Sequence, residues 1–249
     1  MGELRLWRRA SFRPSADACL TARCAGCSQS RERFDKASER FVDVQPESLP
    51  VVPGSTSLSA PALYAIQKAL FRERKEAVIT QADGKVIYKQ LKPGEKEGDW
   101  RDMMVYTDIK GKKMAALGRD IVFPASHAKF TIYSYTPNFE GQESVEVDYD
   151  GVKLYPFALL RCVIPSIPPK YEYLMYKTSN DKPELVSIVN SVCSSIKRGT
   201  MSDRNGHPML KFEEAKENGH IDIEVAKGTD PLQAIAIGIS IDEETTRSK

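Results

Sequence analysis

Short runs of alternating apolar and polar residues fill most of the chain from Ala62 onward. In one of them Val145 and Val147 alternate with Glu146 and Asp148, so that one strand face is apolar and the other is in contact with water. The runs are rich in β-branched and aromatic residues, which favour strands. The pattern therefore predicts an antiparallel sheet of many strands.

Turn-forming pairs separate these runs at Asp83-Gly84, Asp150-Gly151 and Asn218-Gly219, with weaker cases at Asn205-Gly206 and at 108–111. Each pair supplies the positive φ angles that a two-residue type I′ hairpin requires. A meander of hairpins leaves open edges, and closure into a barrel removes them. We expect a mainly β fold, built as a closed antiparallel barrel.

One segment, Asp230 to Ile241, predicts a helix instead. Thr229 or Asp230 can cap it, Pro231 suits a first turn, and acidic residues at 242–244 end the apolar run. A helix that is apolar on all sides must be enclosed. The residues expected to form this core helix are Asp230, Ile235, Ile237, Ile239 and Ile241.

The length of this segment decides what encloses it. About 12 residues reach roughly 18 Å, well short of the roughly 30 Å hydrocarbon core of a bilayer. A buried helix is therefore favoured over a membrane span, and we expect no transmembrane segment. A core strand over IAIGISI is the remaining alternative, which the cap and the proline disfavour. Small residues such as Gly238 would let surrounding strands approach closely.

The start of the chain has a different texture. Residues 1–43 show no sustained period, and the first 31 residues contain six Arg but only two acids. Residues 44–61 hold four prolines among Ser and Gly, which is typical of a linker. We expect a disordered or targeting segment over 1–43, a linker over 44–61 and one domain over 62–245.

Charge and cysteine content narrow the class of protein. The 36 basic and 34 acidic side chains nearly cancel, so no whole-molecule field would attract nucleic acid, and we expect no nucleic-acid partner. Five cysteines without an apolar leader indicate a reducing compartment. We expect a cytoplasmic protein, with peripheral membrane attachment or organelle targeting by residues 1–43 as alternatives.

Motifs of catalysis are missing from the sequence. It contains no GxxxxGK[ST], GxGxxG or GxSxG, and His127, His207 and His220 are dispersed without metal-ligand spacing. Asp203 and Gly206 resemble a calcium loop, but the glycine comes too early, so a polar hairpin turn is the better interpretation. We expect no enzyme, no cofactor and no metal site, with a hidden pocket as the alternative.

Two groups of residues remain as candidate sites. Cys19, Cys24 and Cys27 have a spacing seen in iron-sulfur proteins, but the fourth ligand, Cys162 or Cys193, would come from an apolar run typical of the core. A disordered segment or palmitoylation is the preferred interpretation for the three. The second group is the densest basic cluster of the domain, and it consists of Lys68, Arg72, Arg74 and Lys75.

This basic cluster could meet lipid phosphates, since a cation near an anionic surface contributes about 1 kcal/mol. Glu73 and Glu76 interrupt it, so a solvated hairpin rim is the more ordinary interpretation.

The chain resembles the tubby C-terminal-like fold, and within it most closely the LURP-one-related family. The resemblance covers residues 62 to 245 and is carried by EAVITQADGKVIYKQ, by DMMVYTDIKGKKMAALGRD and by IDIEVAKGTDPLQAIAIGISIDE. It implies a barrel of about 12 strands around the apolar helix.

The resemblance also implies a type of function. Tubby proteins bind phosphoinositide head groups through basic residues, and scramblases of the same superfamily are linked to calcium and lipid. We therefore expect a non-catalytic protein that binds membrane phospholipid head groups or a signalling protein. Scramblase-like lipid transport is the alternative, although the acidic loop of scramblases has no clear counterpart in KFEEAKENGHIDIEVAKGTD.

Overall fold

The computed structural model describes residues 51–67, 76–91, 102–121, 128–163, 170–177, 182–191, 198–203, 205–214 and 220–247. Within these ranges the chain forms many strands and one helix. The strands are β1 (Ala62–Gln67), β2 (Ala77–Gln81), β3 (Val86–Leu91), β4 (Asp102–Asp108), β5 (Lys113–Ile121), β6 (Ala128–Ser134), β7 (Glu146–Val147), β8 (Lys153–Val163), β9 (Lys170–Met175), β10 (Glu184–Ser191), β11 (Arg198–Ser202), β12 (Pro208–Glu214) and β13 (His220–Val225). The helix is α3 (Pro231–Arg247).

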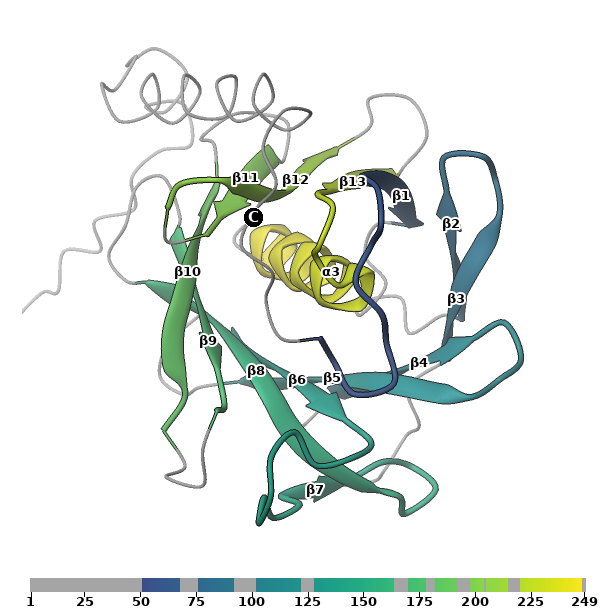
Figure 1. Cartoon of the computed structure of the whole chain (residues 1–249), viewed down its shortest axis with the longest axis vertical. Coiled ribbons are helices and arrows are strands. Elements are labelled where there is room, and N and C mark those ends of the chain that lie inside the picture. The colour runs from purple at the N-terminus through teal and green to yellow at the C-terminus, as the bar shows by residue number, and fades with distance from the viewer. Residues whose placement is uncertain are drawn as a thin grey trace, which may run out of the picture.

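These strands form a closed barrel. Their order is β6-β5-β4-β3-β2-β1-β13-β12-β11-β10-β9-β8, and the pairing of β6 with β8 closes the ring. Every pairing is antiparallel, and the ring encircles α3 (Figure 1). The short strand β7 lies outside this ring and pairs with β8. The prediction of a mainly β, closed antiparallel barrel of 12 strands around an apolar helix is confirmed.

The hairpin turns within the described ranges differ from the two-residue type I′ turns that the sequence predicted, and the predicted turn at Asn218-Gly219 lies outside those ranges. At the β7–β8 turn, the Gly151 N–H bonds to the Asp148 carbonyl, and the Asp148 N–H bonds to the Val152 carbonyl. This is a three-residue loop, in which only the glycine needs its positive φ of 78°. The same backbone pattern recurs at 81–85, 108–112 and 203–207.

Helix α3 fills the barrel. Its isoleucines at 235, 237, 239 and 241 are each at most 2% exposed, as the sequence predicted. Gly238 packs so closely against the wall that an added Cβ would lie 2.3 Å from the Ile223 side chain, which confirms the expected close approach. The barrel interior is therefore a packed core.

The ends of α3 confirm one expectation and correct another. Asp230 caps the helix, because its carboxylate accepts the Leu232 N–H at 2.9 Å. The predicted end near Ile241 is too early, since the helix continues to Arg247 with the acids at 242–244 inside it and buried. The reason is a partner in the wall: Arg119 of β5 forms a buried ion pair with Glu243.

The segment from Val52 to Leu58, hereafter the strap, crosses the mouth of the barrel at which α3 begins. The Val52 side chain is fully buried in the barrel core, and its N–H donates to Asp230 at 2.8 Å. The Leu58 N–H donates to the Thr229 carbonyl, and Gly228 N–H donates to the Leu58 carbonyl. The packed unit thus includes part of the segment expected to be a linker.

A second apolar cluster lies on the outside of the barrel. Met104 and Tyr106 of β4 face α3, so the residues between and before them point outward. The connection from β6 to β8, which contains β7, covers these outward side chains. The cluster consists of Met103, Val105, Ala116, Tyr133 and Leu154, with Tyr135 and Tyr149 packed against it.

Candidate functional site

The packed interior places any binding on the outside or at the mouths of the barrel. All residues of α3 from 231 to 244 are buried. The polar Gln233 accepts a hydrogen bond from the Tyr173 hydroxyl at 2.6 Å, so it is part of the core network. The search for a site therefore turns to exposed side chains.

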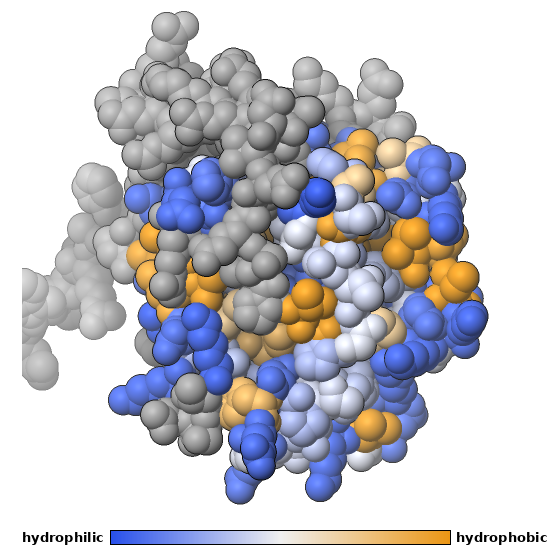
Figure 2. Space-filling view, viewed as in Figure 1, coloured by the Kyte–Doolittle hydropathy of each residue, from blue (hydrophilic) through white to orange (hydrophobic). Residues whose placement is uncertain are grey.

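An exposed apolar patch lies on the outer face of β2 and β3. Val78 is 53% exposed and Leu91 is 37% exposed. Val78 pairs with Lys89 across the two strands, and the Lys89 side chain is exposed. Leu91 lies two residues after Lys89 and therefore on the same face of β3. We call Val78, Lys89 and Leu91 the β2–β3 patch, and apolar surface over these strands is visible at the right of Figure 2.

This patch is adjacent in sequence to the connection that carries the basic cluster. Val78 directly follows the first residue of β2, and β1 ends at Gln67. Lys68, Arg72, Arg74 and Lys75 lie between these two strands in sequence but outside the described residues. The ends of β1 and β2 that flank the cluster are at the same mouth of the barrel as the Arg119–Glu243 pair.

The wall formed by β11, β12 and β13 has a different character. Lys211 and Glu224 are cross-strand neighbours whose charged groups lie 3.7 Å apart. Arg198 and Glu213 pair at 3.6 Å in the same way. Opposite charges neutralise each other on this wall, whereas the β2–β3 patch combines apolar side chains with Lys89, which forms no ion pair with any described residue.

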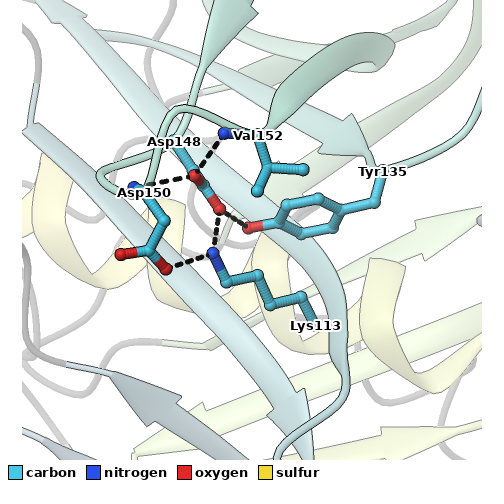
Figure 3. A network of polar contacts seen from close by, with 5 residues as sticks. All are labelled: Lys113, Tyr135, Asp148, Asp150 and Val152. Atoms are coloured by element: carbon cyan, nitrogen blue, oxygen red, sulfur yellow. Dashed lines mark hydrogen bonds and ion pairs between the residues drawn. The ribbon is translucent and has the colours of Figure 1, made fainter.

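A polar network ties the β7–β8 hairpin to the barrel (Figure 3). Lys113 of β5 donates to Asp148 and to Asp150, each at 2.5 Å, and the Tyr135 hydroxyl donates to Asp148 at 3.0 Å. The other Asp148 oxygen accepts the N–H groups of Asp150 and Val152. Asp148 therefore organises its turn and also holds the hairpin against the wall.

The charges of this network stabilise each other. Burial alone would raise the pKa of Asp148, but the hydrogen bonds from Lys113, Val152 and Tyr135 outweigh it and hold that pKa below its ordinary value. Burial alone would lower the pKa of Lys113, and its bonds to Asp148 and Asp150 raise it instead. The network is a structural clamp.

Replacing Asp148 with Asn should lower the stability of the protein by an amount that depends on pH. A depressed folded-state pKa contributes stability above the unfolded pKa of about 3.9, and this contribution is lost as pH falls through the folded pKa. We expect Asp148→Asn to destabilise by about 1 kcal/mol near pH 7, with the difference shrinking as pH falls below about 4 and vanishing only below the lowered folded-state pKa of Asp148. Urea unfolding from about pH 3 to 7 measures it.

The matched control for this prediction is Asp83→Asn, because Asp83 accepts only a backbone N–H, from Lys85, in an exposed turn. A difference between wild type and Asp148→Asn that stays constant through pH 3 would show that the charge of Asp148 contributes nothing.

Asp230 forms a second buried polar centre, at the start of α3. Its carboxylate accepts hydrogen bonds from Val52 N–H and from the Ser55 hydroxyl, both at 2.8 Å. Burial raises the pKa of Asp230 despite these bonds, and burial together with the Asp230 charge raises the pKa of Tyr64 to about 12. Asp230 accepts hydrogen bonds from the strap and from Leu232 of α3, so this centre joins the strap to the helix.

The other sequence candidates show no convergent chemistry. Cys162 is half-buried, and burial raises the pKa of its thiol to about 11, as expected of a packing residue. His207 contacts Asp203 at 3.0 Å within a turn that Asp203 caps, which supports the polar-turn interpretation. His220 is the first residue of β13 and pairs with Gln67, the last residue of β1. Among the described residues, no group of His, Cys, Asp or Glu could hold a metal ion.

Several predicted residues lie outside the described ranges. These are His127, Cys193, the basic cluster and the three N-terminal cysteines Cys19, Cys24 and Cys27. In the part of the chain that is described, no helix has the length and apolar character needed to cross a bilayer.

The β2–β3 patch and the Asp148 clamp were not singled out from the sequence. Strand alternation marks Val78 as facing away from Ile79, yet it does not show whether the outer face is covered. Asp148 could have been found from the repeated Asp-x-x-Gly spacing of the turns, at 108–111, 148–151 and 203–206. Its partner Lys113 is 35 residues away and has no sequence signal.

Comparison with known proteins adds one similar structure. No family model matches the chain, and no curated protein matches its sequence. An X-ray structure of a protein from Arabidopsis thaliana, AT5G01750, is similar with a TM-score of 0.49 and 13% identity. The similarity covers 79% of this chain and 98% of that chain.

Proposed function

We propose that the chain is a non-catalytic domain of the tubby C-terminal-like, LURP-one-related kind that binds anionic phospholipid head groups at a cytoplasmic membrane surface. The observation that carries the proposal is the exposed β2–β3 patch, and the basic cluster immediately precedes β2 in the sequence. A helix-filled barrel supports external binding, since the core side chains of α3 already occupy the interior.

The proposed surface combines two weak attractions. Val78 and Leu91 can enter the head-group layer and remove apolar area from water, at roughly 25 cal/mol per Å². Lys89 and the four basic residues at 68–75 would each add about 1 kcal/mol near an anionic leaflet. Neither attraction alone gives stable attachment, but together they give reversible peripheral binding.

Vesicle binding by the full chain tests the proposal. We expect sedimentation with vesicles of phosphatidylcholine containing about 30% phosphatidylserine or phosphoinositide, and little with phosphatidylcholine alone. Reversal of Lys68, Arg72, Arg74 and Lys75 to Glu should weaken binding at least about tenfold, and Val78→Ser/Leu91→Ser several-fold. Binding should also fall as salt rises.

The control is Val145→Ser/Val147→Ser, which removes equally exposed valines from another face. It should bind like wild type. Equal binding to neutral and anionic vesicles, or no effect of the charge reversal, would contradict the head-group proposal. A protein partner is the second candidate for the same patch: no vesicle binding, together with capture of a partner that the patch variant loses, would favour it.

A further inference from the structure

Exposed apolar and basic side chains continue from the β2–β3 patch along the barrel wall to the β4–β5 turn. We propose that the barrel lies on its side on an anionic membrane, with the outer face of β2, β3 and β4 against the head groups and the β4–β5 turn in contact with the same lipid surface. This orientation rests on the proposed head-group binding and adds a second contact to it.

The register of β3 and β4 places the β4–β5 turn at the end of this wall. Leu91 of β3 pairs with Val105 of β4, and both face outward. Lys89 pairs with Thr107, two residues closer to the turn. Ile109 follows Thr107 by two residues, continues the same outward row and is 55% exposed. The turn lies on the same side of the barrel as β2 and β3 (Figure 1).

Apolar side chains are thus exposed at both ends of the wall. Leu91 lies toward the mouth that holds the Arg119–Glu243 pair, and Ile109 lies at the opposite mouth, roughly 13 Å further along the strands. A flat membrane touches both ends when the barrel axis runs along its surface. A barrel standing on the mouth of the basic cluster would instead hold Ile109 roughly 15–20 Å from the head groups, because β4 spans seven residues.

The charges of this wall fit an anionic surface. Lys89 and Lys110 are exposed, and neither forms an ion pair within the described part of the chain. Strands β2 and β3 contain no acid. The carboxylate of Asp108 in β4 accepts the N–H groups of Lys110 and Lys112, each at 2.9 Å, and so serves its own turn. Each unpaired lysine is attracted to anionic lipid.

Other exposed apolar residues have acidic neighbours. On β10, Leu185 is 45% exposed and follows Glu184, which pairs with Lys177 at 3.2 Å. Near β7, Val145 is 59% exposed and follows the exposed Glu143 by two residues. An anionic leaflet repels such acids, whereas it attracts the lysines of the β2–β4 wall.

Sedimentation of the full chain with vesicles tests this orientation through the double variant Ile109→Ser/Lys110→Glu. The probe is phosphatidylcholine containing about 30% phosphatidylserine. We expect the variant to bind at least about fivefold more weakly than the wild type, because it removes an apolar contact and reverses a charge at the turn. Its melting temperature should match that of the wild type, since both side chains are exposed.

The matched control is Leu185→Ser/Lys182→Glu, which makes the same changes at exposed positions on and next to β10. It should bind like the wild type. Equal weakening by this control would show that total charge governs binding and would overturn the orientation. Wild-type binding by Ile109→Ser/Lys110→Glu, together with weakened binding by Val78→Ser/Leu91→Ser, would overturn the orientation but leave head-group binding standing. Absence of binding by the wild type itself would overturn both.

Discussion

Replacement of Ile237 with Asp is expected to unfold the protein. Ile237 is 1% exposed at the middle of α3, inside the barrel. An unpaired carboxylate buried there costs several kcal/mol, against a total stability of about 5–15 kcal/mol for an ordinary domain. Thermal unfolding followed by circular dichroism should show loss of the cooperative transition.

Two further variants keep this prediction testable if Ile237→Asp yields no folded protein. Ile237→Val should fold and lose about 1 kcal/mol, as for removal of one buried methylene. Ile109→Asp, at a position 55% exposed in the β4–β5 turn, should change stability by less than about 0.5 kcal/mol. An unchanged melting temperature for Ile237→Asp would place α3 outside the core.

The second large effect is expected at the buried ion pair between Arg119 and Glu243. The two side chains are 7% and 5% exposed, so removal of one leaves the other charge in a poorly solvated place. We expect Arg119→Met to cost about 3–5 kcal/mol in the free energy of unfolding. Arg119→Met combined with Glu243→Met should recover most of the loss. Urea unfolding of the three variants gives the coupling.

An exposed pair provides the control. Arg161 and Glu172 bond at 2.6 Å with side chains 55% and 25% exposed, and Arg161→Met should cost at most about 1 kcal/mol. If the losses of Arg119→Met and Glu243→Met simply add, the pair is not coupled, and the extension of α3 beyond Ile241 needs another cause.

The barrel and its central helix could be predicted from local signals. Strand alternation, glycine-containing turns and the cap at Asp230 each act over a few residues, and all three agree on the fold. The end of α3 could not be predicted in this way. Three consecutive acids normally face water, and Arg119, the buried partner of Glu243, lies 124 residues away in the sequence, so no local signal reveals it.

The turn type was missed for a related reason. The Asp150-Gly151 pair suits a type I′ turn, yet the side chain of Asp148 accepts two N–H groups and stabilises a longer loop. Which outward-facing side chains remain exposed could not be predicted from the sequence either, because it depends on what packs over them in the folded protein. Val78 and Val105 both face outward, but only Val105 is covered, by the connection that carries β7.

The arrangement separates stability from binding. The helix-filled core and the buried Arg119–Glu243 pair hold the barrel, while the exposed side chains of the β2–β3 patch can vary without affecting the core. Substitutions of these exposed side chains should therefore change binding with little change in stability.

Side-chain footprinting by hydroxyl radicals, with and without anionic vesicles, tests the proposed function most directly. The account predicts that Val78 and Leu91 become protected when vesicles are present, whereas Leu185, which is 45% exposed on β10, keeps its reactivity. Unchanged reactivity at Val78 and Leu91 on vesicle-bound protein, or protection at Leu185 instead, would contradict the β2–β3 patch as the membrane-binding surface.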